Sequence, residues 1–124
     1  MTNPVASAAV VALASRLVEH VGALDAGWTK VFFRFRSDGS RYGSNASYVT
    51  QGGVLLIGAV KNGTFYDEMN EKDAALFQEL GKDKGVFLLS VDAPSNYDMK
   101  FEWNDLSRWE ISKGQGASGL PKGL

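Results

Sequence analysis

The sequence contains no cysteine, a single histidine and only three prolines in 124 residues. The lack of cysteine excludes disulfide scaffolds and thiolate zinc sites, and it is compatible with a reducing compartment. His20 has no second imidazole or thiol with which to form a metal site or a nucleophile and base pair, so we interpret it as a structural or surface residue. No phosphate-binding loop or dinucleotide fingerprint is present. We therefore predict a protein that is not an enzyme and that uses neither a metal nor another cofactor.

An excess of charge of one sign is also missing. Thirteen basic and fourteen acidic side chains give a formal net charge of -1, which is too balanced for a protein that coats nucleic acid or anionic membrane through its overall field. No Lys or Arg precedes the apolar run over residues 5–14, and Arg16 and Glu19 interrupt it well before the ~20 residues that a membrane span needs. We expect a cytoplasmic protein with no membrane partner and no direct nucleic-acid partner.

The chain has enough hydrophobic and aromatic residues to form a hydrophobic core. It is 44% hydrophobic and carries fourteen aromatic residues, a composition that suits one globular domain. Beyond Ser112 the sequence is rich in glycine and poor in large side chains, so little surface can be buried there to offset the cost of ordering. The prediction is a single α+β domain over residues 1–113, followed by a flexible Gly-rich tail over residues 114–124.

The first part of the chain predicts one helix and two strands. Thr2 or Asn3 can cap a helix that has Pro4 in its first turn. From Thr29 the apolar period changes from 3.6 to two, which indicates a half-buried strand over residues 29–36 and a more polar one over residues 42–50. The apolar stripe of the helix is formed by Val10, Leu13, Leu17, Val21 and Leu24.

The second part predicts more strands and a further helix. Asn62-Gly63 favours a tight hairpin between an aliphatic strand over residues 54–61 and a strand over residues 64–68. A short helix should follow over residues 73–80 and end near Gly81, before strands over residues 86–91 and 97–103. The fold class predicted is thus α+β, with the N-terminal helix packed on an antiparallel meander of about five to six strands and the second short helix before the last two strands.

Two clusters of polar residues are candidates for function. Phe32, Arg34 and Arg36 share one face of the first strand and, with Arg41, could stack on and pair with single-stranded nucleic acid. The alternative, which we favour, is a solvated strand face whose arginines pair with acids across the sheet. The second cluster places four carboxylates within seven residues and could bind a divalent cation or supply an acid and a base. It has no calcium-loop spacing, and acids also suit a helix N-terminus. The four carboxylates are Asp67, Glu68, Glu71 and Asp73.

The order of these elements and their aromatic positions resembles a known family. The segments that carry the resemblance are Gly27-Trp28-Thr29-Lys30-Val31-Phe32-Phe33-Arg34-Phe35, the short helix over residues 73–80, Tyr97-Asp98-Met99-Lys100-Phe101-Glu102-Trp103-Asn104-Asp105 and Arg108-Trp109-Glu110. Up to about Lys113 the chain resembles the YezG-like immunity proteins, formerly a family of unknown function. The resemblance implies a cytoplasmic antitoxin that binds a cognate toxin domain, commonly a nuclease of a contact-dependent or polymorphic toxin system, and neutralises it. The Asn-Gly hairpin, the apolar strand before it and the Gly-rich end depart from the family's pattern.

Such a protein would act by covering the active cleft of the toxin, with aromatic anchors and with acids that match a basic nucleic-acid site. Residues 61–124 carry eleven acidic and eight basic side chains, so the acidic excess lies in this half. Solubility of an exposed face is the alternative role for each acid. A nucleic-acid-binding module and a ligand-binding domain with a pocket between helix and sheet remain alternatives. The predicted contact residues are Tyr66, Asp67, Glu68, Glu71 and Asp73, with Asp98 and Glu102 as second choice.

Overall fold

The computed structural model describes residues 3–124 and begins with helix α1 (Pro4–Leu24). Asn3 caps the helix, because its side-chain Oδ1 accepts a hydrogen bond from the backbone N–H of Ala6 at 3.1 Å, and Pro4 occupies the first turn. Thr2, the other predicted cap, lies outside the described residues. Leu13, Leu17 and Val21 from the predicted apolar stripe are fully buried, whereas Leu24 at the end of the helix is 44% exposed.

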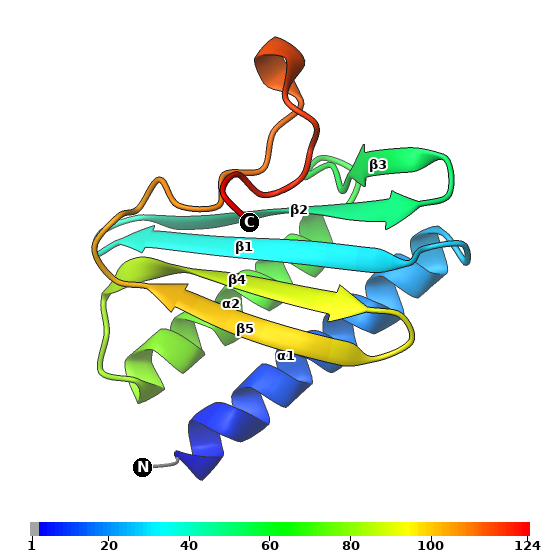
Figure 1. Ribbon diagram of the computed structural model, residues 1–124. Coiled ribbons are helices and arrows are strands. Elements are labelled where there is room, and N and C mark those ends of the chain that lie inside the picture. Colours follow the sequence, from blue (N-terminus) through cyan, green and yellow to red (C-terminus); the bar gives the residue numbers. More distant parts are fainter. Residues whose placement is uncertain (1–2) are drawn as a thin grey trace.

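Five antiparallel strands form one sheet in the order β3-β2-β1-β4-β5. Both helices pack on one face of this sheet (Figure 1). The N-terminal helix, the antiparallel sheet and a second helix before the last two strands confirm the predicted α+β fold class. The strands are β1 (Lys30–Asp38), β2 (Tyr42–Thr50), β3 (Gly53–Leu56), β4 (Lys84–Asp92) and β5 (Asn96–Glu102).

The main core lies between the helices and the sheet. The alternation in β1 turns Phe33 and Phe35 towards the helices, and Phe87 of β4 lies directly opposite Phe35 across the strand pair. Phe77 meets the Phe35 ring edge-on at a centroid distance of 5.1 Å. Buried aromatic rings from two strands and one helix therefore hold the layers together.

Helix α2 (Gly63–Glu79) replaces the hairpin predicted at Asn62-Gly63, and that prediction was wrong. The segment 64–68, expected as a strand, forms the first turns of the helix, and Gly63 has no positive φ angle. The reason is the apolar period: large buried side chains recur at helical spacing from Phe65 to Phe77, and burial of that stripe outweighs the turn preference of one dipeptide. The helix ends before Gly81, whose φ of 69° suits the left-handed position that follows a helix.

The second face of the sheet carries a smaller hydrophobic cluster, which we call the outer cluster, formed by Phe32, Val86, Leu88, Trp109 and Ile111. Trp109 and Ile111 belong to the chain after β5, which crosses this face on the side opposite the helices (Figure 1). The expectation of a solvated face around Phe32 was therefore wrong, because Phe32 is 2% exposed. The chain end folds back on itself through hydrogen bonds from Gly119 N to Ser112 O at 2.9 Å and from Lys122 N to Glu110 O at 3.0 Å. Flexibility of residues 114–124 stays a prediction about motion.

By length and composition α1 could cross a membrane, with a mean hydropathy of 1.4. In the structure its stripe of Leu13, Leu17 and Val21 packs in the main core, as expected for the core helix of a domain.

Candidate functional site

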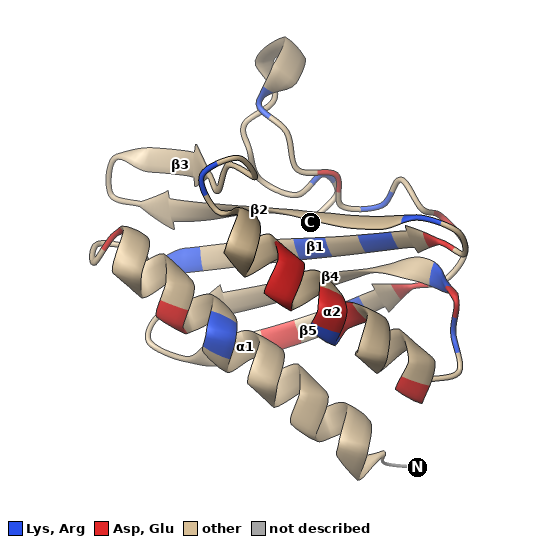
Figure 2. Ribbon diagram, turned by 180° about the vertical axis from the view of Figure 1, so that it is seen from behind, with Lys and Arg blue, Asp and Glu red and all other residues tan. Residues whose placement is uncertain are grey.

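The exposed side of α2 carries the acids that the sequence singled out first. Asp67 and Glu71 are exposed, lie one helical turn apart and form no ion pair within residues 3–124. Glu68 is half-buried, and its Oε2 accepts a hydrogen bond from Arg16 Nε of α1 at 3.1 Å. Figure 2 shows red segments along α2 and a blue segment on the neighbouring helix α1. We call Asp67, Glu68 and Glu71 the acidic face of α2.

Two predicted contact residues do not reach this surface. Tyr66 is 5% exposed, and its hydroxyl donates a hydrogen bond of 2.6 Å to the backbone oxygen of Ile57. Burial raises the pKa of this hydroxyl. Asp73 is fully buried on the core side of α2. Tyr66 and Asp73 therefore cannot contact a partner that docks on the folded protein, and we withdraw both from the predicted surface.

The second-choice residues lie on β5, on the sheet face opposite the helices. Asp98 is exposed there and is paired in register with Ser90 of β4. Glu102 accepts a hydrogen bond of 2.7 Å from Arg108, and this contact, together with the backbone N–H groups of residues 104 and 105, lowers the pKa of its carboxyl. The predicted acids thus form two surfaces on opposite sides of the sheet instead of one.

His20 joins the two helices, in agreement with its interpretation as a structural residue. Its Nε2 donates to Asn62 Oδ1 at 2.8 Å, and Asn62 in turn donates from Nδ2 to the backbone oxygen of Gly58. The imidazole stacks on Phe65 with ring centroids 3.9 Å apart and planes 7° apart. The residue at the start of α2 is thereby fixed to α1, which places the acidic face of α2 on a rigid two-helix layer.

A cavity that the sequence did not reveal lies between the sheet and the C-terminal segment. We call it the outer cavity; its volume is about 370 Å³. Arg34 of β1, which is 8% exposed, lies at its wall and donates from Nε to Arg108 O at 2.8 Å and from Nη2 to Leu106 O at 2.7 Å. Asn45 of β2 donates from Nδ2 to Ile111 O at 2.8 Å. The alternation of side chains along the strand predicts that Arg34 lies on the sheet face that also carries Phe32 and Arg36. No sequence signal predicts that residues 106–122 return to cover it. The other lining residues are Glu110, Ile111, Ser112, Gly114, Gln115, Ala117 and Lys122.

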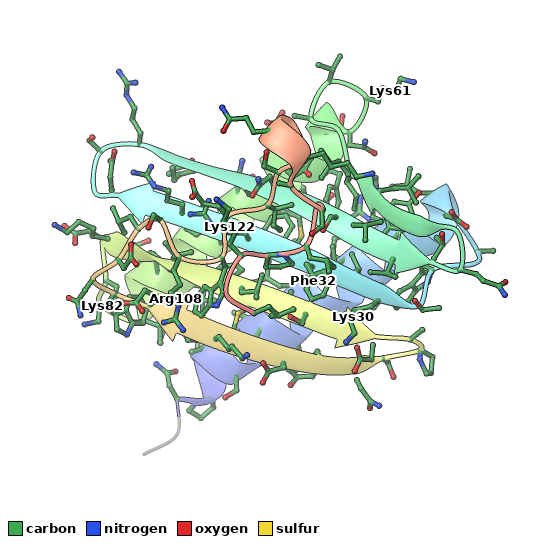
Figure 3. The ribbon with its side chains drawn as sticks, turned by 45° about the horizontal axis from the view of Figure 1, so that its top comes forward. Lys30, Phe32, Lys61, Lys82, Arg108 and Lys122 are labelled. Carbon is green, nitrogen blue, oxygen red and sulfur yellow. The ribbon has the colours of Figure 1, made fainter. Side chains whose placement is uncertain are left out.

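The structure disfavours the nucleic-acid alternative. Phe32 lies beneath the C-terminal segment, and Arg34 is occupied by backbone carbonyl groups, so neither presents a stacking surface to a single strand. Figure 3 shows Phe32 under that segment, with Lys122 and Arg108 on the segment above the sheet. A second hollow, about 380 Å³ between α1 and the β4–β5 hairpin, is mostly apolar and lined by Val11, Ala14, Ser15, Val18, Val91, Ser95 and Tyr97.

Comparison with known proteins adds no assignment: no protein family matches the chain, and no curated protein matches it. Within residues 3–124 there is no group of three or more His, Asp and Glu side chains that could hold a metal ion. The candidate sites are therefore the acidic face of α2 and the outer cavity, on opposite sides of the sheet.

Proposed function

We propose that this protein is a cytoplasmic immunity protein that binds the toxin domain of a contact-dependent or polymorphic toxin system and neutralises it by covering the active site. A nuclease is the toxin activity that we favour. The observation that supports this most is the acidic face of α2, where Asp67 and Glu71 are exposed and form no ion pair in the described part of the chain. The resemblance to YezG-like immunity proteins supplies the kind of partner.

The acidic face has the properties of a docking surface for a basic cleft. It lies on two helices whose relative position is fixed by the Arg16–Glu68 ion pair and by the His20–Asn62 hydrogen bond. A rigid surface loses little conformational freedom on binding. Unpaired carboxylates attract a nucleic-acid-binding cleft, which is rich in Lys and Arg, and speed up the encounter.

The experiment is a rescue assay. The proposal expects a large secreted protein to be encoded directly upstream, and the assay uses the C-terminal domain of that protein. Cells that express this domain should die, and co-expression of the present protein should restore growth and yield a complex that co-purifies. The double variant Asp67→Lys/Glu71→Lys should lose rescue and weaken binding by at least about tenfold, because like charges then face each other. Surface substitutions of this kind leave stability within about 0.5 kcal/mol.

The matched control is Asp98→Lys, an exposed charge reversal on the opposite face of the sheet. It should rescue as well as the wild type. If Asp98→Lys abolishes rescue and the α2 variant does not, the contact surface is the β5 side. An upstream domain that is harmless, or that kills cells without forming a complex, contradicts the proposed function itself.

A further inference from the structure

The outer cavity holds the positive charge of Arg34, which Glu110 in the lining of the same cavity offsets only in part. Arg34 is buried, yet it forms no ion pair within residues 3–124. Its contacts are the two backbone carbonyl groups of Arg108 and Leu106. A buried charge is expensive unless it is paired, and burial accordingly lowers the pKa of this guanidinium. Glu110 attracts Arg34 across the cavity, but no carboxylate of the described residues forms an ion pair with it.

Arg34 keeps unused hydrogen-bond donors and lines a ligand-sized space. A guanidinium has five N–H groups, and the two bonds described here use one on Nε and one on Nη2. Nη1 has no acceptor in residues 3–124. Arg34 lines both the outer cavity and an adjoining hollow of about 200 Å³, whose wall also includes Arg36 and Ser44. Cavities of several hundred Å³ are large enough for small molecules.

The charges of the lining limit the kind of ligand. Arg34 and Lys122 bring positive charge to the outer cavity, whereas Glu110 is the one acid among its lining residues. Figure 3 shows Lys122 lying over the sheet, on the segment that closes this cavity. Glu110 repels a ligand with several anionic groups. A single carboxylate, or a single phosphate ester with a charge of roughly -1.5 to -2 at pH 7, is attracted by the excess of one cation. Asn45, Ser112 and Gln115 add neutral donors and acceptors.

We propose that the outer cavity binds a small organic anion, a carboxylate or a phosphate monoester, whose oxygens accept hydrogen bonds from Arg34 and Lys122. This site is separate from the acidic face of α2, so the proposal does not depend on the proposed function. The guanidinium offers its planar pair of donors to the oxyanion, and the anion supplies the direct ion pair that Arg34 does not form with Glu110.

The test is a titration of the full-length ¹⁵N-labelled protein, followed by NMR, with sodium acetate and with glycerol 2-phosphate as the two probes. Sodium chloride at the same ionic strength corrects for screening. Saturable shifts of the Gln115 and Ile111 amides and of the Arg34 Nε signal are expected with at least one probe. A response to acetate alone assigns a carboxylate, and a response to glycerol 2-phosphate alone assigns a phosphate ester.

Two surface substitutions should change the dissociation constant in opposite directions, and a third serves as the control. Lys122→Ala should raise the dissociation constant at least about tenfold, as loss of a hydrogen bond to a charged group predicts. Glu110→Gln should lower it about two- to fivefold, because it removes the like charge. Lys61→Ala, a lysine on the loop before α2 and away from the cavity (Figure 3), should leave it unchanged. Shifts that do not saturate, that chloride reproduces, or that Lys122→Ala and Glu110→Gln leave unaltered would overturn the proposal.

Discussion

Asp73 is a carboxylic acid inside the apolar core, on the side of α2 that faces the sheet. Neither of its oxygens has a hydrogen-bond partner in the described residues, and burial raises the pKa of the carboxyl well above its ordinary value of 3.8. The folded state consequently keeps a proton that the unfolded chain releases near pH 4. Because the folded state binds more protons in this range, stability is highest below the unfolded pKa and falls as the pH rises towards the folded pKa.

Replacement of Asp73 by asparagine tests this account at the residue scale. Asp73→Asn has nearly the same shape and cannot ionise, so it should remove the loss of stability above pH 4 and exceed the wild type by on the order of 1–3 kcal/mol at pH 8. Urea unfolding at pH 4, 6 and 8 measures the difference. Asp67→Asn, on the exposed side of the same helix, is the control and should follow the wild-type pH dependence. A constant difference between Asp73→Asn and the wild type across this range would refute a titrating Asp73.

At the scale of elements, the start of β4 is shaped by an aromatic side chain from the end of β5. Gly85 has a φ of 155°, and a Cβ atom on it would lie 2.6 Å from Cε3 of the Trp103 ring. The Trp103 ring is held in place by two other rings. Phe101 stacks on it with ring centroids 5.1 Å apart, and the centroid of the Phe77 ring lies 5.5 Å away. Only glycine lets Trp103 lie against the strand, where it covers the end of the main core.

Gly85→Ala should therefore destabilise the protein by about 1–3 kcal/mol, through overpacking and an unfavourable φ. Gly43→Ala is the matched control, because Gly43 also pairs with β1 but a Cβ atom there meets nothing within 4 Å. The control should change stability by at most about 1 kcal/mol, in the stabilising direction. Thermal unfolding of both variants provides the comparison, and equal effects on the melting temperature would contradict the role of Trp103.

The elements also show which sequence signals were sufficient. The alternation of apolar and polar residues predicted β1 and β5, and the capping residue Asn3 predicted the start of α1. These signals are local, and they agree with the side chains that the fold buries. Asn62-Gly63 misled because a turn preference competes with a buried stripe of a whole helix. Tyr66 was assigned to a surface for the same reason, because it fell in the strand predicted over residues 64–68. Asp73 was expected at the start of a short helix, whereas it lies within a longer helix, on the side that faces the core.

At the scale of the whole molecule, one sheet separates two hydrophobic layers. The neighbours Phe32 and Phe33 in β1 point to opposite faces, into the outer cluster and the main core. The outer cavity exists because residues 106–122 return across the outer face, and this return depends on contacts between residues more than 60 positions apart, such as Arg34 with Arg108. Long-range contacts of this kind have no periodic signal, so this site could not be predicted from the sequence.

The shared sheet predicts that both layers unfold together. Loss of the C-terminal segment would expose Phe32, Val86 and Leu88, at roughly 1.5–3 kcal/mol for each large side chain, and would also break the bonds of Arg34 to the segment. That cost is comparable to the 5–15 kcal/mol that stabilises a typical domain, so partial unfolding gains little over complete unfolding.

In the variant Trp28→Phe/Trp103→Phe, fluorescence reports on Trp109 alone. The urea midpoint of this fluorescence signal should equal the urea midpoint of the far-UV circular dichroism signal. Both signals come from the same variant, so any overall destabilisation by the two substitutions cancels in the comparison. A fluorescence midpoint at lower urea would instead make the C-terminal segment an independent unit, which opens the outer cavity without unfolding the sheet.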